Sequence, residues 1–557
     1  MAAPLSAAAE TAPLLRLSDR AGLAIVLAVT AACLLPFLNK AYYIDDTLFL
    51  AAARRILAAP LDPYGFSFNW EGTVDPMSTT MKNPPLVSYY VALVVHLLGW
   101  AEPVLHAAFL LPALAVAAGT FRLARRCCRE PLLAAAAAML SPVFLVSATS
   151  VMCDVPMLAF FVWAVVLWVD GIERDDSRRL ALASVLAALA FLCKYFGASL
   201  VPLLAVYAIA RRARATRWAP WLLVPAGAVA AYSLWTRALY GRSLVFEAAT
   251  FAAEKKIWAG SPFWINTLVA LVFAGGCLLP AGALAAAYLR KWIVGGAAAL
   301  AAAGGMYAWR VTAVPGRNLV DAAEAGAVGL HVGVFCFLGL LVFALAAVEL
   351  RGFREPVTLL LVSWAFGTYV FTGFLNWTIN GRSLLPMAPA AAILAARCVE
   401  ARPARRPRAR RIVLGSVVGA TALVTVLLAA GDALLANSAR EAAGVFTNRM
   451  RADRARYLFM GHWGFQYYME RAGAEPVNFD APALRPGDRI VVPKASARAL
   501  PVPPVAERED LDFRVPGWFA TVSPDRGACF YAHLIGPLPF RVGPISPEKY
   551  RVVTLAR

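Results

Sequence analysis

The sequence lacks the short motifs that mark the common nucleotide-dependent and zinc-dependent enzymes. It has no Walker-type phosphate loop, no Gly-x-Gly-x-x-Gly after a strand-like stretch, no His-Glu-x-x-His and no Cys-x-x-Cys. Only 5 of the 557 residues are histidines. An ATP-driven or zinc-dependent mechanism therefore has no support from the residues.

Cysteine offers no disulfide framework, and no cleavable leader is evident. The 9 cysteines are scattered, and Cys529 alone lies in the long C-terminal tail, so no disulfide can form within that tail. The neighbours Cys127 and Cys128 lie in a basic loop, and we expect them to be inert. The polar N-terminus carries Arg16 and Arg20, and the first apolar run has no cleavage-like end.

Apolar residues are what the chain has in excess. It is 60% hydrophobic with a mean hydropathy of +0.63, which is more than a soluble domain tolerates. The net charge of +19 could suggest a nucleic-acid partner. Most of that charge instead lies in short loops between apolar stretches, as the positive-inside rule expects, so we predict no nucleic acid.

The apolar stretches predict an α-helical polytopic membrane protein with about 13 transmembrane helices. They cover residues 21–39, 103–121, 131–149, 155–170, 180–194, 199–210, 219–237, 264–288, 292–308, 328–348, 357–375, 383–396 and 412–432. One further apolar stretch, 84–99, is shorter than the roughly 20 residues that a crossing needs. If it crossed, the later arginine-rich loops would lie on the side opposite the N-terminus. We therefore expect it to form a juxtamembrane helix in the first outer loop.

This topology divides the chain into three parts. A cytoplasmic tail covers residues 1–20, and a transmembrane catalytic domain covers 21–435, with its first outer loop at 40–102. Residues 436–557 form a small soluble α/β domain on the outer face. In that domain 456–460, 489–493 and 550–555 are typical of strands, and 464–471 of a helix that ends before Gly473.

Two adjacent carboxylates, Asp45 and Asp46, are the best candidates for chemistry. They directly follow the first apolar stretch, in Ala41-Tyr-Tyr-Ile-Asp-Asp-Thr-Leu-Phe-Leu50. They could simply be solvated residues that open a loop. The aromatic and apolar flanks, however, keep the segment near the membrane interface, where ionisable groups are costly and usually functional.

Other polar residues fall on the same predicted outer side, each with a plainer interpretation. Asp154 could cap the next helix, since Val-Pro follows it. Lys194 could extend from a helix end toward water. Lys82 precedes Asn-Pro-Pro, and Arg382 opens a late apolar stretch on the side where positive charge is disfavoured. The pair His462-Trp463 is best explained by folding of the tail.

Carboxylates and cations together on an outer membrane surface suit transfer from a lipid-linked phosphate donor. A carboxylate can deprotonate an acceptor hydroxyl, and cations can stabilise a departing phosphate. Such a leaving group needs no general acid, so a single displacement with inversion would suffice.

The same residues resemble the GT-C glycosyltransferases, most of all the family 39-type group of protein O-mannosyltransferases and lipid A aminoarabinose transferases. The matching elements are Asp45-Asp46, Lys82-Asn-Pro-Pro-Leu86, Asp154-Val-Pro156 and Arg382-Ser-Leu-Leu-Pro386. The resemblance covers about residues 20–400. It departs at Asn83, where the family has histidine, and at Asp46, where it has glutamate.

The resemblance implies roles for these residues. Asp45 would be the catalytic base, Asp46 and Asp154 would orient acceptor or donor, and Lys82, Lys194 and Arg382 would bind the donor phosphate. Asp45 and Asp46 could also hold a divalent cation, Mg²⁺ or Mn²⁺. The implied partners are a polyprenyl-phosphate sugar donor, a lipid, glycan or protein acceptor, and membrane lipids. The implied location is the bacterial inner membrane, with the active site on the periplasmic face.

Two other function classes remain open at this stage. A transporter or flippase of a lipid-linked glycan should carry acidic residues or Gly/Pro breaks in mid-span, in paired halves. The chain shows its acids at outer helix ends and no half-to-half symmetry. A sensor with a ligand-binding outer tail would retain its function after loss of Asp45.

Overall fold

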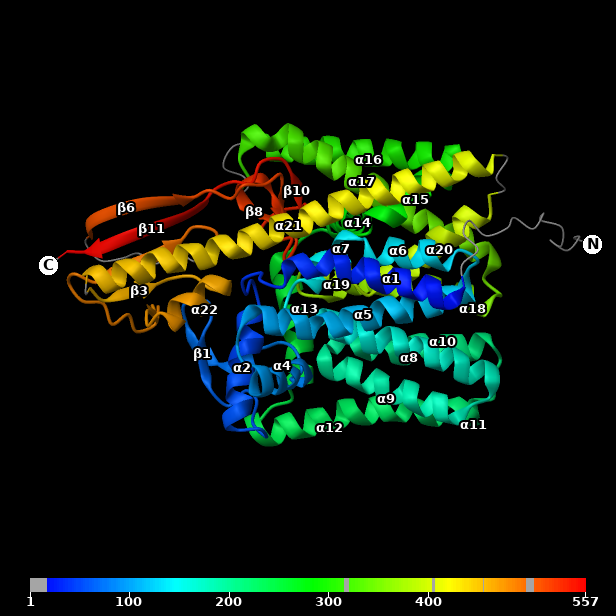
Figure 1. Cartoon of the computed structure of the whole chain (residues 1–557), viewed down its shortest axis with the longest axis horizontal. Coiled ribbons are helices and arrows are strands. Elements are labelled where there is room, and N and C mark those ends of the chain that lie inside the picture. Colours follow the sequence, from blue (N-terminus) through cyan, green and yellow to red (C-terminus); the bar gives the residue numbers. More distant parts are fainter. Residues whose placement is uncertain (1–17, 315–319, 403–405, 454, 497–504, 557) are drawn as a thin grey trace, which may run out of the picture.

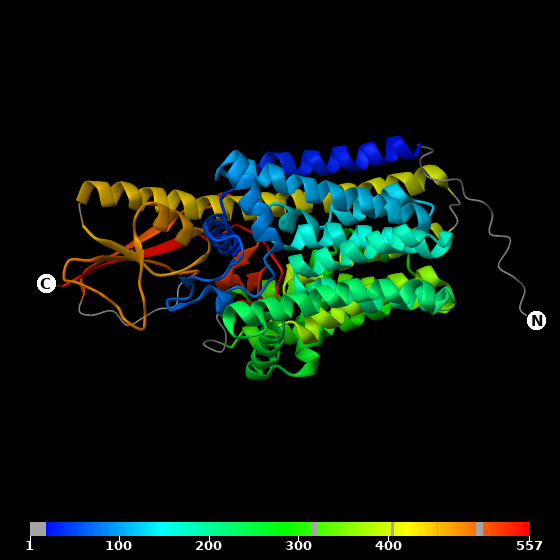
Figure 2. The same ribbon diagram turned by 90° about the horizontal axis from the view of Figure 1, so that it is seen from below.

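The computed structural model describes residues 18–314, 320–402, 406–453, 455–496 and 505–556. A bundle of long helices occupies one part of the molecule, and a C-terminal sheet extends it along the longest axis (Figure 1). The view from below shows the same side-by-side helices (Figure 2). The tail predicted at 1–20 lies almost wholly outside the described residues.

In the described part of the chain, eight helical stretches are long and apolar enough to cross a membrane. Their helices are α1 (Asp19–Leu34), α5 (Glu102–Cys127), α8 (Asp154–Arg174), α12 (Leu223–Tyr240, preceded by the short α11, Ala215–Trp218), α16 (Lys291–Thr312), α17 (Ala325–Glu349), α18 (Pro356–Val370) and α21 (Pro407–Asp453). These stretches are apolar on their outer faces as well as inside. They confirm the prediction of a helical polytopic membrane protein.

Two further spans are bent pairs of helices. α6 (Pro131–Met139) meets α7 (Pro142–Ala148) at 58°, and α14 (Phe263–Cys277) meets α15 (Leu279–Tyr288) at 90°. A proline opens the second helix of each pair, where its missing N–H breaks the helical hydrogen bonds. With these pairs counted as single spans, the total rises to ten.

Shorter helices lie at the remaining predicted positions. They are α9 (Ser177–Cys193), α10 (Leu200–Ala210) and α20 (Met387–Glu400). The stretch 84–99 forms α4 (Leu86–Leu98), whose 13 residues are too few for a straight crossing. The number thirteen stays a prediction, although a helix or helix pair lies at every position that it requires.

The first outer loop folds into short elements at the end of the bundle next to the sheet. They are α2 (Asp46–Ala58), β1 (Ser67–Asn69), β2 (Val74–Pro76), α3 (Met77–Thr80) and α4, and β1 pairs with β2 in antiparallel fashion. α2 packs against α4 and against α22 (Trp463–Arg471) of the C-terminal region.

The C-terminal sheet has the strand order β4-β3-β5-β11-β6. Its strands are β3 (Tyr457–Phe459), β4 (Glu475–Pro476), β5 (Arg489–Pro493), β6 (Val505–Phe513) and β11 (Glu548–Leu555). The three predicted strands are present as β3, β5 and β11, and the predicted helix as α22; β4 and β6 were not predicted. Phe446 of α21, Phe465 of α22 and Tyr550 of β11 lie in one buried cluster that joins the helices to the sheet.

Two observations connect this region to the membrane helices. Helix α21 runs without interruption through residue 436, so the last span and the outer domain share one helix. Between β6 and β11, the chain forms two small sheets, β7 (Phe519–Ala520) with β10 (Arg541–Val542) and β8 (Val522–Ser523) with β9 (Ala528–Cys529), beside the end of the bundle (Figure 1).

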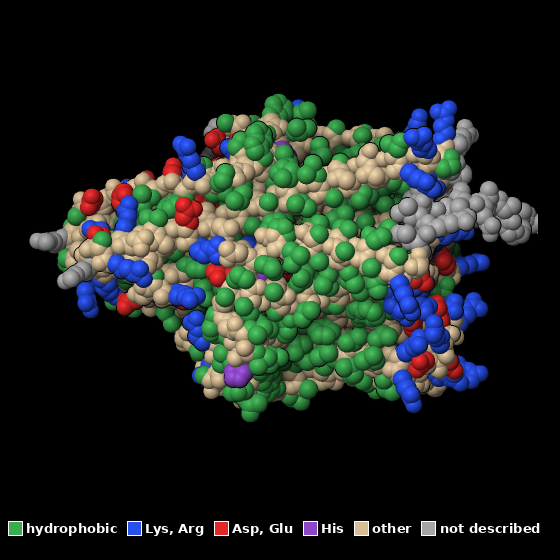
Figure 3. All heavy atoms as spheres, in the orientation of Figure 1, with side chains coloured by type: hydrophobic (Ala, Val, Ile, Leu, Met, Phe, Trp, Pro, Cys, Tyr) green, Lys and Arg blue, Asp and Glu red, His purple; other side chains and the backbone are tan. Residues whose placement is uncertain are grey.

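Charge and apolar surface are separated along the molecule. Lys and Arg side chains gather at the end of the bundle near the N-terminus, and hydrophobic side chains cover the sides of the helices (Figure 3). This is the pattern that the positive-inside rule gives when the N-terminal end is cytoplasmic. The sheet and the first outer loop lie at the opposite end.

Candidate active site

The site is built around the turn between α1 and α2. Ile44 has a φ of +48°, which is strained for a β-branched residue, and Asp45 takes the N-cap position of α2. Side chains from the C-terminal region hold the turn: Asn437 accepts from the Ala41 N–H at 2.9 Å, and the Tyr468 hydroxyl oxygen accepts from the Tyr42 N–H at 2.9 Å. The strain is therefore compensated by contacts from distant parts of the chain.

The two adjacent aspartates have different surroundings. Asp46 is fully buried, and its two oxygens accept from the Tyr43 and Val151 N–H groups, each at 2.9 Å. Burial raises the pKa of Asp46 to about 7, while the charge of Lys40 and these two donors oppose the rise. Asp46 thus links the turn to the loop before α8 through these two hydrogen bonds. Its role in orienting a substrate stays a prediction.

Asp45 instead keeps 28% of its side chain exposed and binds Arg382, with Oδ2 at 2.7 Å from Nη2. Arg382 lies in the short helix α19 (Gly381–Leu384), which the Asn380 side chain caps by accepting from the Ser383 N–H at 2.8 Å. The other end of the Arg382 guanidinium contacts the sulfur of Met152, in the loop before α8. Arg382 therefore joins the acidic turn to the loop before α8, and each of them lies more than 200 residues before Arg382 in sequence.

Arg382 also approaches Asp154, with 3.9 Å between Nη1 and Oδ2. The other oxygen of Asp154 pairs with Lys194 Nζ at 2.5 Å. Asp154 is the first residue of α8, whose N-cap is Cys153, and its side chain makes no capping bond, so the capping interpretation is wrong. Asp45, Arg382, Asp154 and Lys194, here called the charged row, thus follow one another with alternating sign.

Lys82 lies in a separate group. It pairs with Glu247 at 3.0 Å and lies over the Phe251 ring at 4.7 Å, both on helix α13 (Leu244–Ala259). Glu247 also binds Arg242 at 2.9 Å. Among the residues that the structure describes, no hydrogen bond or ion pair joins Lys82 to the charged row, so its role in binding a donor phosphate stays a prediction.

The pair Asp45–Asp46 does not fit a shared divalent cation in this arrangement. Both oxygens of Asp46 already accept backbone N–H groups. Among the residues that the structure describes, no group of three or more His, Cys, Asp or Glu side chains is placed to hold a metal ion. We therefore derive no step through a cation bound by this pair.

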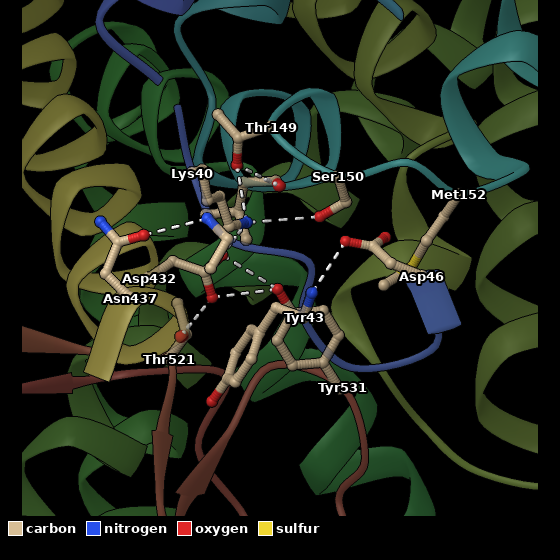
Figure 4. A network of polar contacts seen from close by, with 12 residues as sticks. Lys40, Tyr43, Asp46, Thr149, Ser150, Met152, Asp432, Asn437, Thr521 and Tyr531 are labelled. Carbon is tan, nitrogen blue, oxygen red and sulfur yellow. Dashed lines mark hydrogen bonds and ion pairs between the residues drawn. The ribbon is translucent and has the colours of Figure 1, made fainter. Parts of the chain in front are cut away.

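Sequence reasoning missed a buried ion pair beside the site, Lys40 with Asp432. Both side chains are fully buried, and Lys40 Nζ lies 2.6 Å from Asp432 Oδ2 and 3.1 Å from Thr149 Oγ1 (Figure 4). Asp432 also accepts from Thr521 at 2.5 Å and from Tyr531 at 2.9 Å. Two signals could have pointed to it: a rare lysine at the end of the first apolar stretch and an acid at the end of the last one.

His462 was assigned to folding of the tail, yet it lies close to the site. Its ring packs 5.1 Å from Trp70 and 5.0 Å from Trp463. Burial lowers the pKa of His462 to about 4, and the charge of Asp45 opposes this shift. The imidazole is therefore neutral at pH 7, within reach of the Asp45 charge.

Comparison with known proteins agrees with this architecture. Residues 82–236 match the family described as dolichyl-phosphate-mannose-protein mannosyltransferase. No curated protein matches the chain in sequence.

Among solved structures, ArnT from Cupriavidus metallidurans bound to undecaprenyl phosphate has a TM-score of 0.50 and 14% identity, covering 85% of this chain and 93% of its own. The apo form of that protein gives 0.50 and 15%, with 86% and 94% covered. AglB from Archaeoglobus fulgidus, in complex with an inhibitory peptide and a dolichol-phosphate, gives 0.49 and 13%, with 82% and 64% covered.

The family match covers residues 82–236, and the likeness to ArnT concerns the fold. The family match and the shared fold confirm the resemblance to the GT-C glycosyltransferase superfamily, and within it to the family 39-type group. The chain is thus similar to the GT-C glycosyltransferases in fold and, over residues 82–236, in sequence.

Proposed function

We propose that this protein transfers a sugar from a polyprenyl-phosphate sugar to a hydroxyl group of an envelope lipid, glycan or protein, with inversion at the sugar carbon. The observation that carries the proposal is the charged row. It brings a partly exposed carboxylate, a buried carboxylate and two cations together from four distant segments, at the end of the bundle away from the basic loops.

Asp45 is the base in this proposal. Its carboxylate takes the proton of the acceptor hydroxyl as that oxygen bonds to the anomeric carbon of the sugar. The bond from that carbon to the phosphate oxygen breaks in the same step, and polyprenyl phosphate leaves with the electron pair. The Arg382 guanidinium, 2.7 Å from Asp45 Oδ2, holds this carboxylate in place.

Arg382 and Lys194 receive the departing phosphate. Their side chains are 16% and 17% exposed, so a ligand can reach each of them, and both already face carboxylates. Fixed cations beside a developing negative charge lower the barrier without reorganisation. Asp154 lies between the two and keeps them oriented. Lys82 would join them only by exchanging its partner Glu247 for phosphate.

The donor class and the location are supported by likeness and by charge. ArnT, which has the same fold, was solved with undecaprenyl phosphate. The basic end of the bundle marks the cytoplasmic side, so the site and the C-terminal sheet would face the periplasm of a bacterial inner membrane. A divalent cation, Mg²⁺ or Mn²⁺, would need ligands other than the pair Asp45–Asp46.

The test is release of polyprenyl phosphate from a panel of labelled polyprenyl-phosphate sugars. Membranes carrying wild type or Asp45→Asn are incubated with an envelope extract as acceptor, and the labelled product is extracted and sized. We expect release and product with wild type only. Equal release by both proteins would contradict the role of Asp45.

A flippase of lipid-linked glycans is the second candidate, and the same experiment separates the two. A flippase would move the intact donor across vesicles without releasing polyprenyl phosphate. Movement without release, with any member of the panel, would overturn the transferase proposal.

A further inference from the structure

The C-terminal segment 519–542 lies against the membrane helices. Its buried side chains Ala528, Cys529, Phe530, Tyr531, Leu538 and Phe540 belong to the same core cluster as the transmembrane helices, whereas the five-stranded sheet has two clusters of its own. Phe540 packs 4.7 Å from Phe335 of α17. The segment is therefore a part of the bundle end.

Segment 519–542 is hydrogen-bonded to the loop that precedes Arg382. The Gly381 N–H donates to the Phe530 carbonyl at 2.7 Å, and the His533 N–H donates to the Ile379 carbonyl at 2.8 Å. The Ile379 N–H in turn donates to His533 Nδ1 at 3.0 Å. A Cβ on Gly381 would lie 2.3 Å from the Phe530 ring, so the two strands of chain approach as closely as glycine allows.

Tyr531 connects this loop to the buried ion pair. Its ring lies under the Arg382 guanidinium, with 5.6 Å between Cζ and the ring centroid. Its hydroxyl donates to Asp432, which Lys40 neutralises (Figure 4). Burial keeps the pKa of Tyr531 well above its usual value, so the hydroxyl remains a donor.

The buried pair gives Tyr531 a fixed anchor. Two charges removed from water are costly to bury, and they are retained where their bonds select one arrangement. Here the Asp432 carboxylate has three side-chain partners, Lys40, Thr521 and Tyr531. The ring of Tyr531 can therefore move little, and neither can the guanidinium that rests on it.

We propose that Tyr531 is a positioning residue for Arg382, and that segment 519–542 is an integral part of the active site. The inference rests on the proposed function, in which Arg382 binds the donor phosphate. Tyr531 keeps the guanidinium between Asp45 and Asp154, at the place where the phosphate arrives. Loss of the ring would weaken phosphate binding about 3- to 30-fold, the range of cation–π contributions.

The experiment compares Tyr531→Leu with Tyr531→Phe in the full-length protein. Phenylalanine keeps the ring under Arg382 and loses only the bond to Asp432, whereas leucine loses both. Trp518→Ala, at a side chain that is 66% exposed directly before this segment, is the matched control. Binding of undecaprenyl phosphate in detergent is measured together with the KM for the sugar donor and the melting temperature.

We expect Tyr531→Leu to weaken undecaprenyl phosphate binding and to raise the donor KM, while Tyr531→Phe retains most of the affinity and Trp518→Ala all of it. In an Arg382→Lys background, Tyr531→Leu should have a smaller effect, because it acts through Arg382. Affinity that falls equally in the leucine and phenylalanine variants, or not at all, would overturn the inference.

The two failures can be told apart. If wild type neither binds undecaprenyl phosphate nor turns over any donor, the proposed function fails. If wild type does both and Tyr531→Leu matches it, only the positioning role fails. Should Tyr531→Leu not accumulate, Tyr531→Phe and Asp432→Asn decide: both leave the ring, so both should keep the affinity while lowering the melting temperature.

Discussion

Helix α8 buries an aspartate near each end, and the two are paired differently. Near its C-terminal end, among the basic loops, Asp170 is in contact with Arg126, with Arg179 at 3.2 Å and with Arg122 at 3.7 Å. At its N-terminal end, Asp154 shares Arg382 with Asp45 and has Lys194 as its second partner.

The two sets of ion pairs differ in kind: those of Asp170 are structural, and those of Asp154 belong to the candidate active site. Asp170 pairs with three partly exposed arginines, two on α5 and one on α9, so it ties α8 to these two helices. At the other end Arg382 is shared between two carboxylates, Lys194 pairs with Asp154, and the carboxylate of Asp45 remains partly exposed. Cations that divide their contacts can turn to a ligand phosphate without leaving a buried charge alone. A shared arginine and a partly exposed carboxylate, rather than the presence of acid–arginine pairs, distinguish the end that we propose to be functional.

The largest effect is expected at Asp45. Asp45→Asn removes the base but keeps the side-chain shape, so turnover should fall about 10²- to 10⁴-fold. Yield and melting temperature should stay near wild type, because this side chain is partly exposed. A variant that fails to accumulate in membranes would instead make Asp45 a structural residue.

The next largest is expected at Arg382. Arg382→Lys keeps the charge but loses the planar fork that meets Asp45 and Asp154 together, so turnover should fall about 10²- to 10³-fold. Arg179→Lys makes the same change at the other end of α8 and should leave turnover unchanged. Equal losses in both variants would remove the distinction between the two ends.

Asp46→Asn should affect stability more than chemistry. An amide has one acceptor oxygen where the Tyr43 and Val151 N–H groups need two, so unfolding should become easier by about 1–3 kcal/mol. Denaturation in detergent measures this, and turnover is expressed per folded molecule. A variant that is fully stable but inactive would mean that Asp46 takes part in the reaction.

Asp170→Asn should have a smaller effect than Asp46→Asn. Its three arginines are 24–51% exposed and can be solvated when the acid is lost, so the cost should be about 1 kcal/mol or less. Donor turnover should not change. A loss of turnover would mean that the basic end contributes to the reaction.

The smallest effect concerns pH and His533. Burial, and then the charge of Lys256, lower the pKa of His533 to about 4, below the ordinary value of 6.5. The neutral ring accepts from the Ile379 N–H, so its contribution to stability is complete above pH 6.5 and is lost as pH falls toward 4. The melting temperature of wild type should therefore drop more between pH 7.5 and 5 than that of His533→Gln. Equal drops would exclude His533 as the titrating group.

Much of the architecture could be predicted from the order of residues. Apolar stretches located the helices because a membrane demands them, and arginine-rich loops located the sides. Asp45, Asp154, Lys194 and Arg382 were chosen from their places at outer helix ends, and the fold brings all four into one row. Lys82 followed the same logic but lies with Glu247, because α13 folds next to it.

The sequence by itself determined that the chain is a helical membrane protein, which end of it faces the basic side, and which outer residues can do chemistry. These follow from hydropathy and charge, which act residue by residue. Only the tertiary structure decided that Asp45 is partly exposed and Asp46 fully buried, that Lys40 pairs with Asp432, and that Tyr531 lies under Arg382. Those contacts join segments up to hundreds of residues apart, and they depend on how the helices and the C-terminal segment pack rather than on any local pattern.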